Sequence, residues 1–424
     1  MRQDIKERVE QIRQGKVPEG YKKEKLGIVP EEWNETSFST LFTSTSDYTD
    51  DLDKYPLYSL TIEDGITPKT ERYERSHLVK KEDSYKIVRP NDYAYNPMNL
   101  RFGAVARHKG NMPVAVSGYY DIFTTVHESD LPFMDSFLTC GPMITYYNRV
   151  STGSLVEKQR VHFSQFLEFV LPLPSINERA KIAAILTTQN KIIELKEKRL
   201  AQKQRQKKYL MQQLLTGKKR LLEFSEEWKI KPLKKLTEKQ KKKNDGFQYR
   251  LVLSNSAQHG IVSQDQEFDK EIANEERIDG YYIVIPGAFV YNPRISVTAP
   301  CGPINVNETG ETGIMSPLYT VFTISSPQIS QDFLKYYFQS SCWYKYVKGV
   351  ANYGARHDRI SISDGDFFDM PIPLPTKEEQ NYIAKVLSAA DREIELLQQD
   401  IEQEKQKKKA LMQLLLTGIV RVNV

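Results

Sequence analysis

Apolar residues recur every seven positions in two stretches of the chain, and this spacing predicts two long helices that each bury one stripe. The stripe residues are Leu186, Ile193, Leu200 and Leu214 in the first stretch and Leu387, Ile394, Ile401 and Leu415 in the second, with Leu210 and Leu411 at intermediate positions. The seam becomes polar in the middle, at Lys203 and Lys207 in one helix and at Glu404 and Lys408 in the other. We therefore expect a coiled-coil-like pair whose helices either splay there or pair Lys with Glu across the seam.

The ends of both helices are marked by the same signals. Ser175 with Glu178, and Thr376 with Glu379, fit the capping box, in which the hydroxyl accepts from the third amide and the glutamate reaches back to the cap amide. Glycines at 217 and 418 stand where a left-handed residue ends a helix. Each helix of about 40 residues would be a rod about 60 Å long.

The two helices belong to a repeat that covers the chain. LPLPSINERAKIAAIL, starting at Leu171, returns as IPLPTKEEQNYIAKVL, starting at Ile372, and the offset of 201 holds without a gap for about 51 residues, of which about 21 are identical. Fainter matches lie upstream, where Glu31-Glu32-Trp33 returns as Glu226-Glu227-Trp228. The chain is therefore a tandem duplication of about 195–200 residues. Its two helices are expected to lie antiparallel about a pseudo-two-fold axis.

The segments between the helices predict α+β domains, because they are rich in Tyr, Phe, Val, Pro and Gly. Expected strands include Tyr281–Ile285, Ala288–Tyr291 and Leu318–Ile324, and an expected helix covers Gln331–Tyr346. Residues 3–14 predict a short helix whose end echoes the end of the central long helix, as if the duplication were circularly shifted. The predicted order is a helical segment (1–23), a domain (24–170), a long helix (171–217), a second domain (218–371) and a second long helix (372–424).

Charge is unevenly placed although the net charge is only +5. From Lys198 to Arg220 there are nine Lys and Arg and no acid, and from Lys229 to Lys243 there are eight Lys and one acid. Such runs are either solvated surface or the contact surface for a polyanion. No apolar run approaches the ~20 residues of a membrane helix, and the first residues have no apolar secretion segment. With three widely spaced cysteines, a cytoplasmic protein without a membrane partner is expected.

Motifs for common enzyme chemistry are missing from the sequence. There is no phosphate loop, no GxGxxG after a strand, no HExxH and no GxSxG, and the six histidines lie apart without metal-ligand spacing. Tyr95-Asn96-Pro97-Met98 and Tyr291-Asn292-Pro293-Arg294 resemble the first half of the (N/D)PP(Y/F) loop of amino-methyltransferases. The second Pro and the following aromatic are missing from both, so a strand-ending turn is favoured.

A second resemblance covers nearly the whole chain. The twice-used order of a domain of about 150 residues, (L/I)PLP, a capped long helix and LLTG resembles the specificity subunit of type I restriction–modification systems. The signature PLP…EQ…I is complete in the second copy, whereas the first has Glu178-Arg179 in place of Glu-Gln. This resemblance implies two target recognition domains, two shared helical regions and a circular organisation.

The resemblance also implies a non-catalytic subunit that reads double-stranded DNA and carries no cofactor. Two modification subunits, which bind S-adenosylmethionine and methylate adenine, would dock on the helices, and restriction subunits that use ATP and Mg²⁺ would join them. Each domain would read half of a split site, and the rods would set the spacer. Two other functions remain open: a stand-alone adenine methyltransferase and a coiled-coil scaffold that does not bind DNA.

Candidate DNA contacts are cations near the Tyr-Asn-Pro turns and in one basic run, because Arg and Lys contact base edges and phosphates. They are Arg101, Arg107 and Lys109 in the first domain, and Lys241, Lys242, Lys243, Arg294, Arg356 and Arg359 in the second. Arg356 and Arg359 belong to a glycine-containing basic loop, and Lys241–Lys243 suit phosphate contact. The competing interpretation for each is an ordinary solvent-exposed cation.

Overall fold

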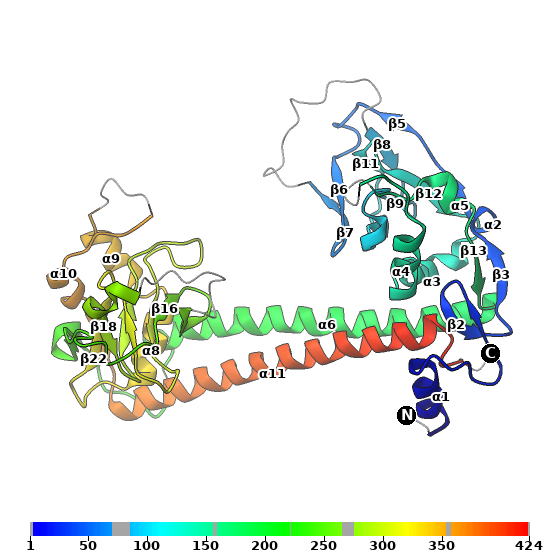
Figure 1. Ribbon diagram of the computed structural model, residues 1–424. Coiled ribbons are helices and arrows are strands. Elements are labelled where there is room, and N and C mark those ends of the chain that lie inside the picture. The colour runs from blue at the N-terminus through cyan, green and yellow to red at the C-terminus, as the bar shows by residue number, and fades with distance from the viewer. Residues whose placement is uncertain are drawn as a thin grey trace. The chain divides into compact units, whose positions relative to one another are not determined.

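The computed structural model describes residues 3–69, 85–155, 159–220, 222–264, 275–352 and 358–422. The chain folds into two compact units: unit 1 is Met1–Glu197 with Asp400–Val424, and unit 2 is Lys198–Gln399 (Figure 1). Two long helices, α6 (Ile176–Leu214) and α11 (Lys377–Leu416), run through both units. Each unit therefore contains one strand-rich domain and one part of each helix.

The domain of unit 1 is built from antiparallel sheets. The sheets are β10-β9-β12-β4, β11-β8-β5, β6-β7, β13-β3 and β1-β2. The strands are β1 (Tyr21–Glu24), β2 (Gly27–Pro30), β3 (Asn34–Ser37), β4 (Phe42–Ser44), β5 (Tyr48–Thr49), β6 (Tyr58–Thr61), β7 (Gly65–Pro68), β8 (Tyr85–Val88), β9 (Tyr93–Tyr95), β10 (Val105–Arg107), β11 (Val114–Ser117), β12 (Asp121–Thr125) and β13 (Val170–Leu173). The helices are α1 (Gln3–Arg13), α2 (Phe38–Leu41), η2 (Leu100–Phe102), η3 (Glu128–Asp130), α3 (Leu131–Phe137), α4 (Gly141–Val150) and α5 (Phe163–Leu167).

The domain of unit 2 repeats four of these sheets, again antiparallel. The sheets are β20-β19-β22-β15, β18-β21, β16-β17 and β14-β23. The strands are β14 (Lys229–Pro232), β15 (Thr237–Lys239), β16 (Leu253–Ser256), β17 (Gly260–Ser263), β18 (Tyr282–Val284), β19 (Phe289–Tyr291), β20 (Ile304–Val306), β21 (Gly313–Met315), β22 (Thr320–Ile324) and β23 (Pro371–Leu374). The helices are η5 (Leu233–Lys235), η6 (Glu275–Gly280), α8 (Gln331–Gln339), α9 (Tyr344–Val350) and α10 (Asp364–Phe368).

Strand register confirms that the two domains share one plan. Tyr95 on β9 pairs with Val105, and the matching Tyr291 on β19 pairs with Ile304. Each tyrosine is fully buried and stacks on a phenylalanine of the short helix before the last strand: Phe166 at 5.5 Å and Phe367 at 4.9 Å. The predicted α+β class, built from a duplicated domain and long helices, is therefore confirmed.

The predicted helix over Gln331–Tyr346 is wrong in one respect, because two helices occupy this segment. α8 ends at Gln339, and α9 begins at Tyr344. The Ser340 hydroxyl donates to the Tyr337 carbonyl at 2.6 Å, and Trp343 is buried in the core with its indole N–H donated to the Phe338 carbonyl at 2.9 Å. Serine competes for backbone hydrogen bonds at helix ends, and burial of the tryptophan requires the chain to turn here.

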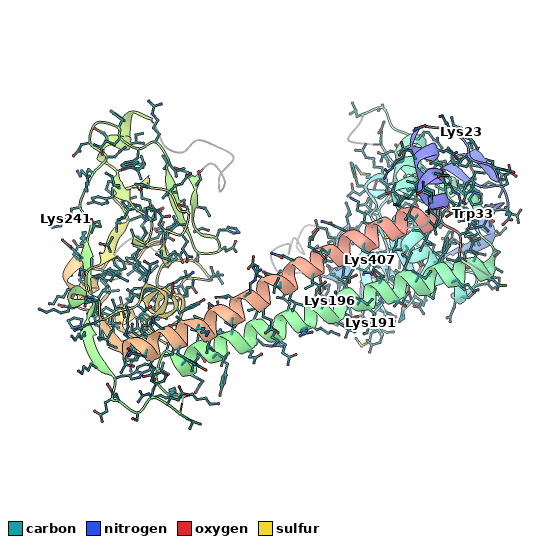
Figure 2. All side chains as sticks on the ribbon, turned by 90° about the horizontal axis from the view of Figure 1, so that it is seen from below. Lys23, Trp33, Lys191, Lys196, Lys241 and Lys407 are labelled. Carbon is teal, nitrogen blue, oxygen red and sulfur yellow. The ribbon has the colours of Figure 1, made fainter. Side chains whose placement is uncertain are left out.

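The residues of the predicted apolar seam lie on α6 and α11 in both units. All ten seam residues are buried or half-buried, and Leu186, Ile193, Leu214, Leu387, Ile401 and Leu415 are fully buried. Within unit 1, Lys196, which is labelled in Figure 2, contacts Asp400 at 2.8 Å. Within unit 2, Lys203 contacts Glu393 at 2.8 Å. Rising residue numbers on α6 thus meet falling numbers on α11, which makes the pairing antiparallel.

Ion pairs join the two helices in the polar middle of the seam. This agrees with the expectation that Lys pairs with acidic residues across the seam, and not with splayed helices. Lys207 forms an ion pair with Asp391 in unit 2, while in unit 1 Glu404 accepts from Lys196 at 2.9 Å and from the Gln189 amide at 2.6 Å. No helix among the described residues is long and apolar enough to cross a membrane.

The N-terminal caps of both helices are confirmed in part. The Ser175 hydroxyl accepts from the Glu178 amide, and the Thr376 hydroxyl accepts from the Glu379 amide, each at 3.3 Å. The glutamate half of the capping box is wrong in both copies, because each carboxylate bonds to an arginine instead. A guanidinium offers two charge-assisted hydrogen bonds, which are stronger than one bond from a neutral amide.

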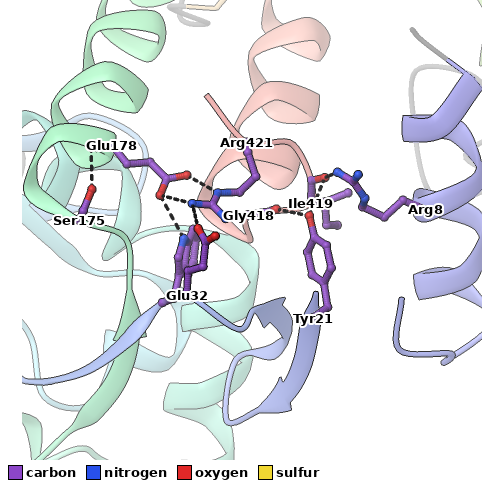
Figure 3. A network of polar contacts seen from close by, with 9 residues as sticks. Arg8, Tyr21, Glu32, Ser175, Glu178, Gly418, Ile419 and Arg421 are labelled. Atoms are coloured by element: carbon purple, nitrogen blue, oxygen red, sulfur yellow. Dashed lines mark hydrogen bonds and ion pairs between the residues drawn. The ribbon is translucent and has the colours of Figure 1, made fainter. Parts of the chain in front are cut away.

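In unit 1 the buried carboxylate of Glu178 joins the two ends of the chain (Figure 3). It accepts from Arg421 at 2.6 and 3.0 Å and from the Trp33 indole at 3.3 Å. Next to this cluster, the Tyr21 hydroxyl donates to the Gly418 carbonyl at 2.9 Å. The segment after α11 therefore completes the domain at the start of the chain, which is the predicted circular organisation.

In unit 2 the same cluster forms within a single stretch of chain. Glu379 accepts from Arg220 at 2.9 and 2.7 Å and from the Trp228 indole at 3.0 Å. Arg220 follows α6 as Arg421 follows α11. The duplication thus extends from backbone topology to a three-residue polar cluster.

Substitution of the two helix-ending glycines is expected to have unequal effects. Gly217 and Gly418 both have a left-handed backbone, with φ of 68° and 69°, so alanine at either should cost about 1–2 kcal/mol. A Cβ on Gly418 would lie 2.5 Å from Pro30 and 2.8 Å from Trp33, whereas one on Gly217 meets Trp228 at an ordinary 3.5 Å. Gly418→Ala should therefore lose about 1–3 kcal/mol more than Gly217→Ala, as measured by urea unfolding. Equal losses would contradict this packing.

Candidate nucleic-acid interface

A polar cleft in unit 2 brings together two of the predicted arginines. Arg294 and Arg359, 65 positions apart in the sequence, lie opposite each other in an antiparallel backbone bridge. Both line a cavity of about 290 Å³ that also includes Asn255 and Asn292. Arg294 is exposed, and its guanidinium has no ion pair or hydrogen bond within the described part of the chain. Its five N–H donors are therefore directed at solvent and available to a ligand.

The floor of this cleft is held by an asparagine network that the sequence analysis missed. The buried Asn255 amide donates to the Val290 carbonyl at 2.7 Å, and the Asn305 amide donates to the Asn255 side-chain oxygen at 2.7 Å. Asn292 donates to the Asn255 carbonyl at 3.1 Å and accepts from the Arg294 backbone amide at 3.0 Å. The available signal was a polar asparagine at an inward strand position, where such residues are depleted.

The Tyr-Asn-Pro segments are strand-ending turns, as the favoured interpretation expected. Asn96 accepts from the Met98 amide at 3.1 Å, which matches the Asn292 turn. The Tyr95 and Tyr291 hydroxyls donate to the carbonyls of Val161 and Cys301 at 3.0 and 3.1 Å. Both rings are buried and their hydroxyls are bonded, so neither tyrosine can stack on a base.

In unit 1 the predicted cations Arg107 and Lys109 share one carboxylate, Asp135. Arg107 donates to its two oxygens at 2.9 and 2.8 Å and to the Asn91 side chain at 2.6 Å. Lys109 lies 3.2 Å from the same carboxylate. Burial alone would raise the pKa of Asp135, but the Arg107 hydrogen bonds and the Lys109 charge lower it below its ordinary value. Arg107 is thus largely committed to the protein, with its side chain only 17% exposed.

Asp135 could not be identified from the sequence. It lies 28 positions after Arg107, on a different element, and no local motif links the two. Only the packing of α3 on the sheet brings them together. Arg107, Lys109 and Asp135 line a cavity of about 370 Å³ that Arg101 does not line.

The remaining predicted contacts are more dispersed. Arg101 lies over the Phe102 ring at 4.5 Å and donates to Gln159 at 3.1 Å. Lys241, which is labelled in Figure 2, is exposed after β15, as are Lys242 and Lys243. None of the three lines the cleft of Arg294 and Arg359. Arg356 lies outside the described residues. Among the described residues, no three His, Cys, Asp or Glu are placed to hold a metal ion.

Comparison with known proteins yields one family. Residues 225–406 match the family model described as type I restriction modification DNA specificity domain. The chain is 24% identical to the putative type I restriction enzyme MjaX specificity subunit of Methanocaldococcus jannaschii, over 95% of this chain and 97% of that protein. It is 26% identical to the type I restriction enzyme MjaVIII specificity subunit of the same organism, over 61% of this chain and 63% of that protein.

The fold has a solved counterpart. A chain from a structure described as the basis of complex assembly and conformational transition of the type I R-M system covers 92% of this chain, and 99% of its own length is matched. The TM-score is 0.55 at 14% sequence identity. At that identity, the likeness concerns the fold.

Proposed function

The chain belongs to the family of type I restriction–modification specificity subunits, and from this premise we propose that it reads a two-part DNA site for a methyltransferase complex. In this role it catalyses no reaction itself. The domain of each unit reads one half of the site through base edges in the major groove, where each base pair presents a distinct pattern of donors and acceptors.

The observation that carries the proposal is the duplicated domain with unlike polar surfaces. The sheets, the buried tyrosines and the cap clusters repeat, but side chains at some matched positions differ in charge. Arg294 in unit 2 corresponds to Met98 after the same turn in unit 1. One scaffold with two different surfaces suits the reading of two different half-sites.

We propose that the cleft of Arg294 and Arg359 supplies direct base contacts in unit 2. An exposed guanidinium with unused donors matches the O6 and N7 acceptors of guanine. Lys241, Lys242 and Lys243 are assigned to phosphate contact, which fixes position without reading sequence. Arg101 is assigned a weaker role, because its guanidinium is already stacked on Phe102 and bonded to Gln159.

The long helices are proposed to set the spacer and to bind two modification subunits. α6 and α11 are each continuous through both units, so their length is a property that both domains share. S-adenosylmethionine and ATP with Mg²⁺ are assigned to the modification and restriction subunits. None of these cofactors is assigned to this chain.

Two measurements test the proposal. The complex with modification subunits should bind its target DNA with a strong salt dependence and should prefer it about 10³-fold or more over random DNA. Calorimetry with the isolated chain and S-adenosylmethionine should show no heat of binding. Binding heat would favour a stand-alone methyltransferase, and a complex that assembles without binding DNA would favour a scaffold.

A further inference from the structure

In each unit the strand-rich domain meets the long helices at five corresponding positions. His108 in unit 1 and Asn307 in unit 2 occupy equivalent backbone positions. Each exchanges backbone hydrogen bonds with the turn that precedes the strand β9 or β19. The residues that follow, Lys109 and Glu308, therefore correspond. Helix residues Asp135 and Lys335 correspond through their neighbours Phe133 and Phe333, which are both fully buried.

The other three correspondences follow from sheet register and from the repeat. Arg107 pairs with Tyr93 as Val306 pairs with Phe289. The repeat offset of 201 relates Lys408 to Lys207 and Asn190 to Asp391. The five positions are thus Arg107, Lys109, Asp135, Lys408 and Asn190 in unit 1, and Val306, Glu308, Lys335, Lys207 and Asp391 in unit 2.

In unit 2 the charges at these positions cancel. Lys335 lies 2.5 Å from Glu308, and Lys207 forms an ion pair with Asp391. All four line one cavity of about 650 Å³. Two cations and two carboxylates leave no net charge.

In unit 1 the same positions hold three cations and one carboxylate. Asp135 is shared by Arg107 and Lys109. Lys408 lines a groove between α6 and α11 together with the neutral Asn190. Two positive charges are left over. Burial lowers the pKa of Lys408, and the nearby charge of Lys109 lowers it further.

Other acidic groups nearby have partners of their own or form no ion pair with these cations in the described part of the chain. Glu194, which lines the groove with Lys408, pairs with Lys191 at 3.3 Å. Glu197 pairs with Lys405 at 2.8 Å, and Glu404 pairs with Lys196 at 2.9 Å. Glu63 and Asp64 line the cavity of Arg107 and Lys109, but no ion pair joins them to these cations in the described part of the chain.

We propose that Lys109 and Lys408, supported by Arg107, form a site for one DNA backbone phosphate in unit 1, and that unit 2 has no such site at the corresponding place. The inference rests on the proposed DNA-reading function and adds an asymmetry to it. A phosphodiester carries one negative charge at any physiological pH and accepts several hydrogen bonds, so it can bond to both lysines and offset one of the two surplus positive charges. Lys109, with its side chain 66% exposed, provides the open side of the site.

The repeat itself supplies the test variant. Asn190→Asp introduces into unit 1 the carboxylate that neutralises the corresponding lysine in unit 2, with almost no change in side-chain shape. Lys408→Gln removes the cation instead. Gln403→Glu is the control, since it adds a negative charge at an exposed position of α11 that does not line the groove.

The measurement is the salt dependence of binding of the complex with modification subunits to its target duplex. Asn190→Asp and Lys408→Gln should each lower the slope of log K against log salt by about 0.9 and weaken binding about fivefold near 0.15 M salt. The double variant should lose no more than either single variant, and Gln403→Glu should match the parent. Asn190→Asp should unfold at the parent's temperature or above, because it adds an ion pair.

The outcomes separate this inference from the proposed function. A parent complex that does not bind DNA contradicts the proposed function and the inference together. A parent that binds, with both variants keeping its full salt slope, overturns only the phosphate site. Variants that fail to recruit the modification subunits, as seen by sedimentation, would show that an acidic protein surface occupies the site, which also overturns it.

Discussion

Deletion of residues 193–199 together with residues 394–400 is expected to shorten the unread spacer of the DNA site by about three base pairs. Seven helical residues span about 10.5 Å, and B-DNA rises about 3.4 Å per base pair. One heptad also returns an α-helix to within about 20° of its starting orientation. The deletion removes the paired Lys196 and Asp400 together, so the antiparallel seam closes again with its heptad pattern preserved.

The matched control is the insertion of one heptad into each helix at the same points, which should lengthen the spacer by the same amount. Both half-sites should remain unchanged in sequence, since neither domain is altered. Adenine-methylation mapping reads the spacer directly. An unchanged spacer in both variants would show that helix length does not set it.

Arg294→Ala is expected to weaken recognition of one half-site by about 1–3 kcal/mol, the value of a bidentate arginine–guanine contact. The guanidinium is exposed and has no protein partner among the described residues, so its removal should leave the free energy of unfolding nearly unchanged. Arg359→Ala, on the other side of the same cleft, should affect the same half-site. Competition binding with duplexes altered in one half-site at a time measures the effect.

Arg107→Ala is the contrasting variant. Arg107 makes three hydrogen bonds within the protein, so its loss should lower stability before it alters base preference. If Arg294→Ala weakens binding to target and random DNA equally, Arg294 contacts phosphate and does not read a base.

Helices, caps and the repeat could be predicted from the sequence because their signals are local or periodic. The seam from Leu186 to Leu415 depends on a seven-residue spacing, and the hydroxyl caps depend on residues three positions apart. The partners of Glu178 could not be predicted, since Trp33 lies 145 positions before it and Arg421 lies 243 positions after it. Only the closing of the chain ends on each other brings them together.

The sequence predicted which cations are candidates for the interface. It did not predict which of them are free to bind DNA and which are bound to other side chains of the protein. Arg294 and Arg107 follow similar turns in the sequence, yet one is open to solvent and the other is bound to Asp135. That difference arises because the two arginines occupy different positions of the repeat: Arg294 matches Met98 directly after the turn, whereas Arg107 lies on β10 beside Asp135 of α3. The first copy departs from the Glu-Gln signature at Arg179, and this departure also depends on a distant partner. Arg179 forms a buried ion pair with Asp130 at 3.0 Å, whereas Gln380 in the second copy accepts a hydrogen bond from the Ser330 amide.

Genome-wide adenine-methylation mapping, with and without this gene, is the decisive measurement of the proposed DNA-reading function. Methylation is expected at a site of two specified half-sites separated by a fixed unread spacer, and it should be lost when the gene is deleted. Methylation that persists without the gene, or that falls on one continuous site without a spacer, would contradict this function.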